Sequence, residues 1–209
     1  VVADTALAIG ETSGVTITFS EAVTGFTNAD LSIANGTLSA VSSSDGGTTW
    51  TATLTPTAGI TDTTNLITLD NTGVADAAGN AGTGSTDSNN YVVDTLAPVL
   101  ATATVNGNQL VLTYTEAATL DAANAPATTD FAVAVGATAN TVTAVAVNAA
   151  AKTVTLTLTT AVVAGQAVTV AYTDPTAGND ANAIQDAAGN DAASFAATSA
   201  TNLTPAIPD

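Results

Sequence analysis

The pentapeptide Asp-Ala-Ala-Gly-Asn occurs twice in this chain, at residues 76–80 and at residues 186–190. In each copy an amide side chain follows a carboxylate, and the intervening glycine can adopt a positive φ that turns backbone carbonyls toward the same side. Ca²⁺ takes about six to eight oxygen ligands from carboxylates, amides and carbonyls, in loops that need not be rigid beforehand. The repeated loop therefore points to calcium binding.

Further acidic residues join these loops if the chain folds as a β-sandwich, because the loop after the second strand and the loop between the last two strands lie at one end of such a fold. The set predicted for the second half, at its boundary with the first half, is Asp94, Glu116, Asp174, Asp180, Asp186 and Asn190. The set predicted for the first half, at the end that would face an upstream neighbour, is Asp4, Glu21, Asp70, Asp76 and Asn80. Crowded carboxylates raise one another's pKa unless a cation neutralises them. Calcium is the predicted cofactor, since magnesium prefers a tighter octahedral geometry and zinc prefers His or Cys, which the chain lacks.

The pentapeptide also has an interpretation without an ion. It is consistent with one helical turn in which Asp is the N-cap and glycine ends the turn. Asp30 and Asp130 fit this capping role better than metal binding, because each precedes an expected strand.

Charge and composition exclude several classes of partner. Eighteen acidic residues against the single base Lys152 give a formal net charge of −17. Nucleic acid and anionic membrane surfaces are therefore poor partners, whereas cations suit the chain; the alternative is that the charge serves only solubility. No membrane insertion is expected, since no apolar run is long enough to span a bilayer.

Enzymatic activity is not expected. Without His or Cys the chain can form neither a Ser-His-Asp triad nor a thiol nucleophile. Paired carboxylates could hydrolyse glycosides, but a sugar cleft usually needs aromatic platforms, and the only tryptophan, Trp50, falls on an expected core strand.

The acids must be positioned by short strands. Val15, Ile17 and Phe19 alternate with Thr and Ser, which is the period of a half-buried strand, and similar Val- and Thr-rich runs recur between Gly, Asn and Asp. Around seven strands per hundred residues predict an immunoglobulin-like sandwich. A helical turn within 120–127 is also compatible with the sequence, limited by Pro126.

The sandwich pattern is read twice along the chain. Phe19-Ser-Glu-Ala22 is echoed by Tyr114-Thr-Glu-Ala117, and the pentapeptide follows each in the same order. The predicted fold class is therefore all-β, with two tandem immunoglobulin-like domains, 1–94 and 95–209, joined by a short stiff linker at 94–98. The absence of methionine and of a signal-peptide pattern suggests a piece of a longer protein.

These residues carry a family resemblance. Residues 9–26, with Asn28-Ala-Asp30, 35–38 and 76–80, resemble the bacterial Ig-like repeats of giant surface adhesins. Residues 114–116, 170–175 and 184–191 resemble the related flagellar-system-associated repeat of long bacterial surface proteins. The resemblance implies type I secretion, as in repeats-in-toxin (RTX) adhesins, and calcium at domain junctions. It also implies side-chain ligation by Glu21, Asp76, Glu116 and Asp186, with Asp4 and Asp94 contributed by linkers. The longer loop 174–192 departs from its counterpart, which puts the ligand count of the second domain in doubt.

The leading hypothesis is a calcium-rigidified structural extender of a secreted bacterial adhesin at the cell surface, acting in adhesion and biofilm formation. Its partners would be calcium and the neighbouring Ig-like domains of the same chain, while other domains contact a cell-surface glycan or protein. One alternative is that a domain of this chain itself binds a glycan or peptide. Another is an accessory domain of an extracellular hydrolase.

Overall fold

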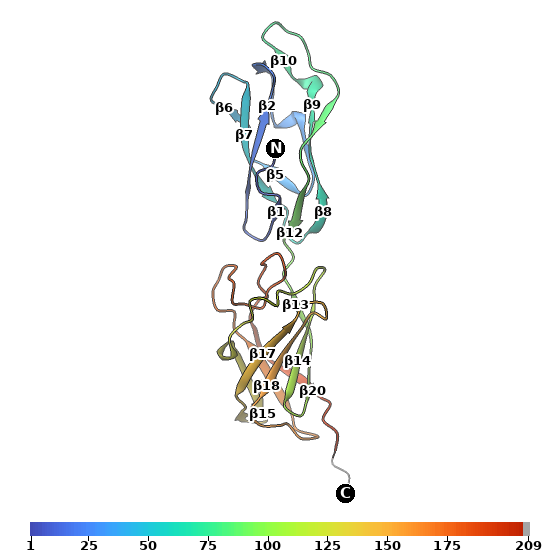
Figure 1. Cartoon of the computed structure of the whole chain (residues 1–209), viewed down its shortest axis with the longest axis vertical. Helices are drawn as coiled ribbons and strands as arrows, with labels where there is room; N and C mark the ends of the chain where they lie inside the picture. The colour runs from blue at the N-terminus through green and yellow to red at the C-terminus, as the bar shows by residue number, and fades with distance from the viewer. Residues whose placement is uncertain (207–209) are drawn as a thin grey trace. The chain divides into compact units, whose positions relative to one another are not determined.

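The computed structural model, which describes residues 1–206, divides into two compact units, Val1–Leu96 (unit 1) and Ala97–Asp209 (unit 2) (Figure 1). This division lies two residues after the predicted boundary at residue 94. The predicted all-β class is confirmed: the helices among the described residues are three short 3-10 turns, each of 3 residues.

Unit 1 is built from short strands that follow the Val- and Thr-rich runs. They are β1 (Ala6–Leu7), β2 (Ser13–Thr18), β3 (Val23–Thr24), β4 (Leu31–Ile33), β5 (Gly36–Leu38), β6 (Ser42–Ser43), β7 (Thr49–Pro56), β8 (Thr61–Asn65), β9 (Ile67–Asp70), β10 (Ala75–Asp76), β11 (Ser85–Asp87) and β12 (Tyr91–Asp94). The 3-10 turns η1 (Asn28–Asp30) and η2 (Asn71–Gly73) precede β4 and β10.

The strands of unit 1 form several small sheets around one core. The largest has the order β2-β7-β5, and others are β11-β9-β4 and β1-β12-β8, in which β1 and β12 run parallel. On β2, Val15 is buried and Ile17 packs on the core while Thr16 and Thr18 are exposed, as the alternation predicts. Leu54 of β7 and Tyr91 of β12 are fully buried in the same core.

Unit 2 contains longer strands. They are β13 (Val99–Asn106), β14 (Gln109–Thr115), β15 (Phe131–Val135), β16 (Thr138–Ala139), β17 (Val142–Asn148), β18 (Thr153–Leu158), β19 (Val168–Tyr172) and β20 (Phe195–Asn202), with the 3-10 turn η3 (Thr128–Asp130) before β15.

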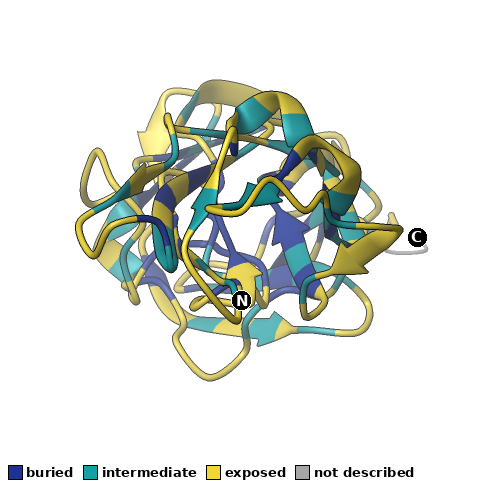
Figure 2. Cartoon of the chain, turned by 90° about the horizontal axis from the view of Figure 1, so that it is seen from above, coloured by how far each residue is buried: buried dark blue, intermediate teal, exposed yellow. Residues whose placement is uncertain are grey.

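The strands of unit 2 pair in one series, β16-β15-β19-β20-β13-β14-β18-β17. Its middle pair, β13 with β20, is parallel and short: Thr104 pairs with Thr201 and Val105 with Asn202. The two antiparallel halves on either side contribute to one shared core, which contains Val133, Val170, Leu112 and Leu156. Most buried residues fall on the strands, and exposed residues are frequent in the loops (Figure 2). The loops therefore carry most of the acidic side chains.

Several local predictions can be compared with these elements. Asp30 and Asp130 stabilise the turns η1 and η3 before a strand, as predicted, because each carboxylate accepts a backbone N–H at 2.8 Å, from Thr27 and Ala127. Each is the third residue of its turn, however, and the N-cap positions belong to Thr27 and Ala127. The helical turn within 120–127 is wrong, because the segment pairs with a neighbouring loop instead. In the part of the chain that the structure describes, no helix is both long and apolar enough to cross a membrane.

Candidate metal centre

The second copy of the pentapeptide folds as a closed turn centred on the Asp186 carboxylate. Asp186 Oδ1 accepts the backbone N–H groups of Ala188 at 2.8 Å and Asn190 at 2.9 Å. The Asn190 amide donates to Asp186 Oδ2 at 2.8 Å, and the Asp186 N–H donates to the Asn190 carbonyl at 3.1 Å. Gly189 has φ 90°, a conformation that strains any side-chain-bearing residue. Asp186 and Asn190 are both fully buried.

The first copy makes the same turn at the surface of unit 1. Asp76 Oδ1 accepts the N–H groups of Ala78 and Asn80 at 2.9 and 2.8 Å, and the Asn80 amide donates to Asp76 Oδ2 at 2.6 Å. Gly79 has φ 89°. The hydrogen bond from the Asn80 side-chain amide lowers the pKa of Asp76 most, and the backbone N–H hydrogen bonds to the same carboxylate lower it further. Each aspartate thus caps its own turn, as the interpretation without an ion predicts, yet its oxygens keep lone pairs available for a ligand.

A second carboxylate lies next to Asp186 in unit 2. An oxygen of Glu116 is within 4.8 Å of an oxygen of Asp186. Glu116 is only 7% exposed; its Oε1 accepts the Ala118 N–H at 2.9 Å, whereas its Oε2 is buried with no hydrogen-bond partner. An unpartnered buried carboxylate oxygen is costly, and a second buried carboxylate nearby adds repulsion. The donor set, two buried carboxylates of which one oxygen has no partner, fits a hard cation such as Ca²⁺.

A short ladder between two loops brings these carboxylates together. Glu116 directly follows β14, while Asp186 lies in the loop between β19 and β20. Leu120 forms an isolated antiparallel bridge with Asp186, and the Ala187 N–H donates to the Thr119 carbonyl at 2.9 Å. The segment after β14 is thereby fixed against the loop that carries the pentapeptide.

A further group of carboxylates comprises Asp174, Asp180 and Asp191, whose oxygens lie within 4.8 Å of one another. The Oδ1 atoms of Asp174 and Asp191 are buried without a hydrogen-bond partner. Burial, and then repulsion from Asp180, raises the pKa of Asp174; burial, with repulsion from Asp174 among other causes, raises the pKa of Asp191. Asp191 was not among the predicted ligands. The tripeptide Gly-Asn-Asp at 178–180 and again at 189–191 is the sequence signal that links Asp180 with Asp191.

Two protein-family models match the chain in succession. Residues 1–93 match a family described as "Bacterial Ig-like domain", and residues 93–177 match one described as "Putative flagellar system-associated repeat". The chain is similar to a bacterial Ig-like domain followed by a flagellar system-associated repeat. These are the two families whose resemblance the sequence motifs carry. Asp180, Asp186 and Asp191 lie beyond the matched part of the repeat.

Among solved structures, the N-terminal part of the bacterial S-layer protein SbsC is similar with a TM-score of 0.38 and 20% sequence identity. The similarity covers 48% of this chain and 22% of that one, so it involves about a fifth of the SbsC chain. No curated protein matches this sequence. Below, unit 1 is called the Ig-like domain and unit 2 the repeat domain.

The predicted ligands of the Ig-like domain are only partly brought together. Glu21 and Asp76 line one cavity of about 350 Å³. Asp4 lies elsewhere: its N–H donates to Ser13 Oγ at 2.8 Å at the start of β2, whereas Glu21 follows the end of β2. A strand of this length separates them by about 16 Å. Asp70 caps η2 by accepting the Thr72 N–H at 2.9 Å.

Asp94 is the last residue of β12 and therefore ends the Ig-like domain's sheet. Its Oδ1 accepts the Thr61 hydroxyl at 2.9 Å across the β12–β8 pair. The chain then passes through Thr95 to Pro98 into β13, which is the connection that the sequence predicts to be short.

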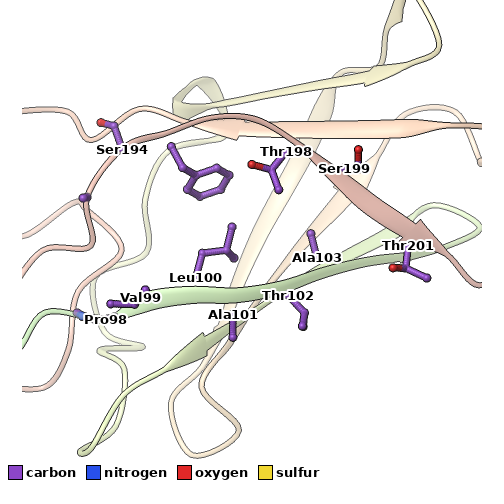
Figure 3. Close-up of a pocket in the computed structure, with 12 residues that line it drawn as sticks. Pro98, Val99, Leu100, Ala101, Thr102, Ala103, Ser194, Thr198, Ser199 and Thr201 are labelled. Atoms are coloured by element: carbon purple, nitrogen blue, oxygen red, sulfur yellow. The ribbon is translucent and has the colours of Figure 1, made fainter.

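A cavity of the repeat domain has a different character. It holds about 580 Å³ between the first half of β13 and the first half of β20, where the two strands do not pair. Leu100 and Ala103 point from β13 toward β20, whereas Ala101 and Thr102 point away (Figure 3). No carboxylate lines this groove, so it does not suit a cation.

Proposed function

We propose that this chain is a calcium-rigidified structural extender segment of a large secreted bacterial adhesin. The observation that carries the proposal is the buried, unpartnered Oε2 of Glu116 beside the fully buried carboxylate of Asp186. A protein that left these groups without a cation would lose stability to desolvation and repulsion, and the chain's one basic side chain, Lys152, donates to carbonyls rather than to either carboxylate.

In this proposal, Glu116 and Asp186 bind one Ca²⁺. Asp94 stays a predicted ligand at the linker, where the sequence resemblance implies that calcium rigidifies the connection between domains. Asn190 holds Asp186 in place through its amide. Asp174 in the repeat domain, and Asp4, Glu21, Asp70, Asp76 and Asn80 in the Ig-like domain, remain predicted ligands of further ions.

The match to a bacterial Ig-like family supports a location on the bacterial cell surface, with a structural rather than an enzymatic role. Secretion by a type I system and a part in biofilm formation follow from the resemblance to repeats of RTX adhesins. In such a fibre, calcium and the neighbouring Ig-like domains are the partners of this segment, and other domains contact the target surface.

Calorimetric titration with calcium tests the site. Glu116→Gln and Asp186→Asn each remove one ligand charge at nearly constant volume, and Asp87→Asn is the matched control, because Asp87 is exposed on β11 and belongs to no predicted set. We expect the first two variants to bind fewer ions or to bind more weakly, and the control to bind as the parent does. Parental binding by both site variants would refute the proposed site.

Solution scattering tests the rigidifying role separately. We expect the maximum dimension of the parent to differ between calcium and chelator, because repulsion among the acids lets the junction bend when the ion is removed. Identical scattering profiles in the two buffers would contradict the mechanical part of the proposal while leaving calcium binding intact.

A second candidate function is direct peptide binding by the repeat domain. The groove between β13 and β20 favours it, because both strands present unpaired edges to which an extended peptide could add as a strand. Under this alternative, an extended Val- and Thr-rich peptide should shift the amide resonances of residues 99–103 and 195–199, and Leu100→Arg should abolish the effect. A glycan array tests the remaining ligand class. Absence of any shift at these strands would exclude the groove.

A further inference from the structure

Lys152, the only basic residue of the chain, occupies an unexpected position. It lies in the turn between β17 and β18 with φ 57°, a conformation that costs roughly 1 kcal/mol or more for a residue with a side chain. Its ammonium donates to two backbone carbonyls, those of Glu116 and, at 3.4 Å, Ala117. The Lys152 ammonium thus binds the backbone carbonyl of Glu116, the proposed calcium ligand.

The rest of this turn holds the same segment at both ends. The Tyr114 N–H donates to the Lys152 carbonyl at 2.9 Å, just before Glu116. The Leu120 N–H donates to the Ala149 carbonyl at 3.3 Å, just after it. The segment from β14 to Leu120 is therefore hydrogen-bonded to the β17–β18 turn on one side and to the Asp186 loop on the other.

We infer that Lys152 is a positioning residue for the metal ligand Glu116. By binding the carbonyls of Glu116 and Ala117, the ammonium fixes the backbone from which the Glu116 side chain extends, so that Oε2 stays in the buried pocket beside Asp186. Lys152 is not proposed as a ligand, because an ammonium repels a cation. This inference rests on the proposed calcium site.

The chemistry of the contact dictates the variants. Lys152→Met keeps most of the aliphatic stem but removes every donor, whereas Lys152→Arg keeps the charge and the donors. Since partners that orient metal ligands typically contribute about 10–100-fold to metal affinity, we expect Lys152→Met to weaken calcium binding by about tenfold or more and Lys152→Arg to recover most of the loss. Calcium titration of the full chain measures both, with Glu116→Gln as the reference for loss of the ligand itself.

A second readout does not depend on calcium. In chelator, amide resonances of Ala117 and Ala118 should shift in Lys152→Met and return toward the parental positions in Lys152→Arg, because only the ammonium contact to the carbonyls has changed. If Lys152→Met leaves these resonances in place, or binds calcium with parental affinity while Glu116→Gln does not, the positioning role is overturned. If Glu116→Gln itself binds as the parent does, the calcium site fails instead, and the resonance experiment still decides whether Lys152 holds the segment.

Discussion

Glu116→Gln should change the stability of the repeat domain in opposite directions with and without calcium. In chelator, the variant removes one of two buried carboxylates whose oxygens lie within 4.8 Å of each other. At that distance, the repulsion between two unit charges is about 3.5 kcal/mol at an effective dielectric constant of about 20, and about 0.9 kcal/mol in water. The amide also keeps an oxygen to accept the Ala118 N–H. We therefore expect the variant to be about 1–3 kcal/mol more stable than the parent without calcium.

With calcium the order should reverse. A single site occupied at a hundredfold excess over its dissociation constant adds about 2.7 kcal/mol to the parent, and the variant should lose most of this gain. The prediction is therefore a change of sign, which a simple loss of packing at Glu116 could not produce.

Hydrogen exchange of the full chain measures this for each domain in one experiment. Amides of β14 and β18 report unfolding of the repeat domain, and those of β7 report the Ig-like domain, which should be unaffected and serves as the internal control. If Glu116→Gln destabilises the repeat domain in chelator, or if calcium protects it as much as the parent, the assignment of Glu116 as a ligand is refuted.

Three further changes test other parts of the structure. Tyr172→Phe removes the hydroxyl that accepts the Ile184 N–H at 2.9 Å in a buried position, and should lower the free energy of unfolding of the repeat domain by about 1–3 kcal/mol; an unchanged denaturation midpoint would contradict this. Burial raises the pKa of Asp191, so the folded state binds more protons than the unfolded state between the ordinary and the raised pKa, and stability falls as the pH rises through that range. In chelator, Asp191→Asn should accordingly be more stable than the parent at pH 7, with the difference vanishing below about pH 4, and an equal difference at both pH values would argue against it. Leu54→Ala, at a fully buried position, should cost the Ig-like domain about 2–5 kcal/mol, read from Trp50 fluorescence, and a smaller loss would mean that the core closes around the cavity.

The sequence predicts the apolar strands well and the polar ones poorly. β15 (Phe-Ala-Val-Ala-Val) and β18 (Thr-Val-Thr-Leu-Thr-Leu) lie on runs of the kind that the sequence predicts as strands, because each combines β-branched residues with alternating burial. β8 and β20 were not predicted: β8 is Thr-Asp-Thr-Thr-Asn and β20 is mostly Ala, Thr and Ser, so neither shows an apolar period. They form because neighbouring strands supply pairing partners, which a local pattern does not reveal.

For the candidate site, the repeated Asp-Ala-Ala-Gly-Asn motif located the two turns, but it did not show which other carboxylates lie near them. The pairing of Glu116 with Asp186 was predictable, since the order of strands places their loops at one end of the domain. The separation of Asp4 from Glu21 was not, because it depends on how residues 1–4 pair with the start of β2, where Val2 forms an isolated antiparallel bridge with Val15, and so short a contact has no signature in the sequence. Asp191 escaped prediction for a related reason: residues 173–192 contain no regular element whose period could bring it to Asp174.

In both domains the first and last strands pair in parallel, β1 with β12 and β13 with β20. Because parallel partners enter and leave at opposite ends, tension applied through the chain pulls the two strands along each other rather than peeling them apart. The interstrand bonds are then loaded in shear and must fail together, instead of opening one after another. Each domain is thus arranged to resist being unfolded by tension. The resistance depends on the few parallel residue pairs between its first and last strands and on the core that packs against these strands.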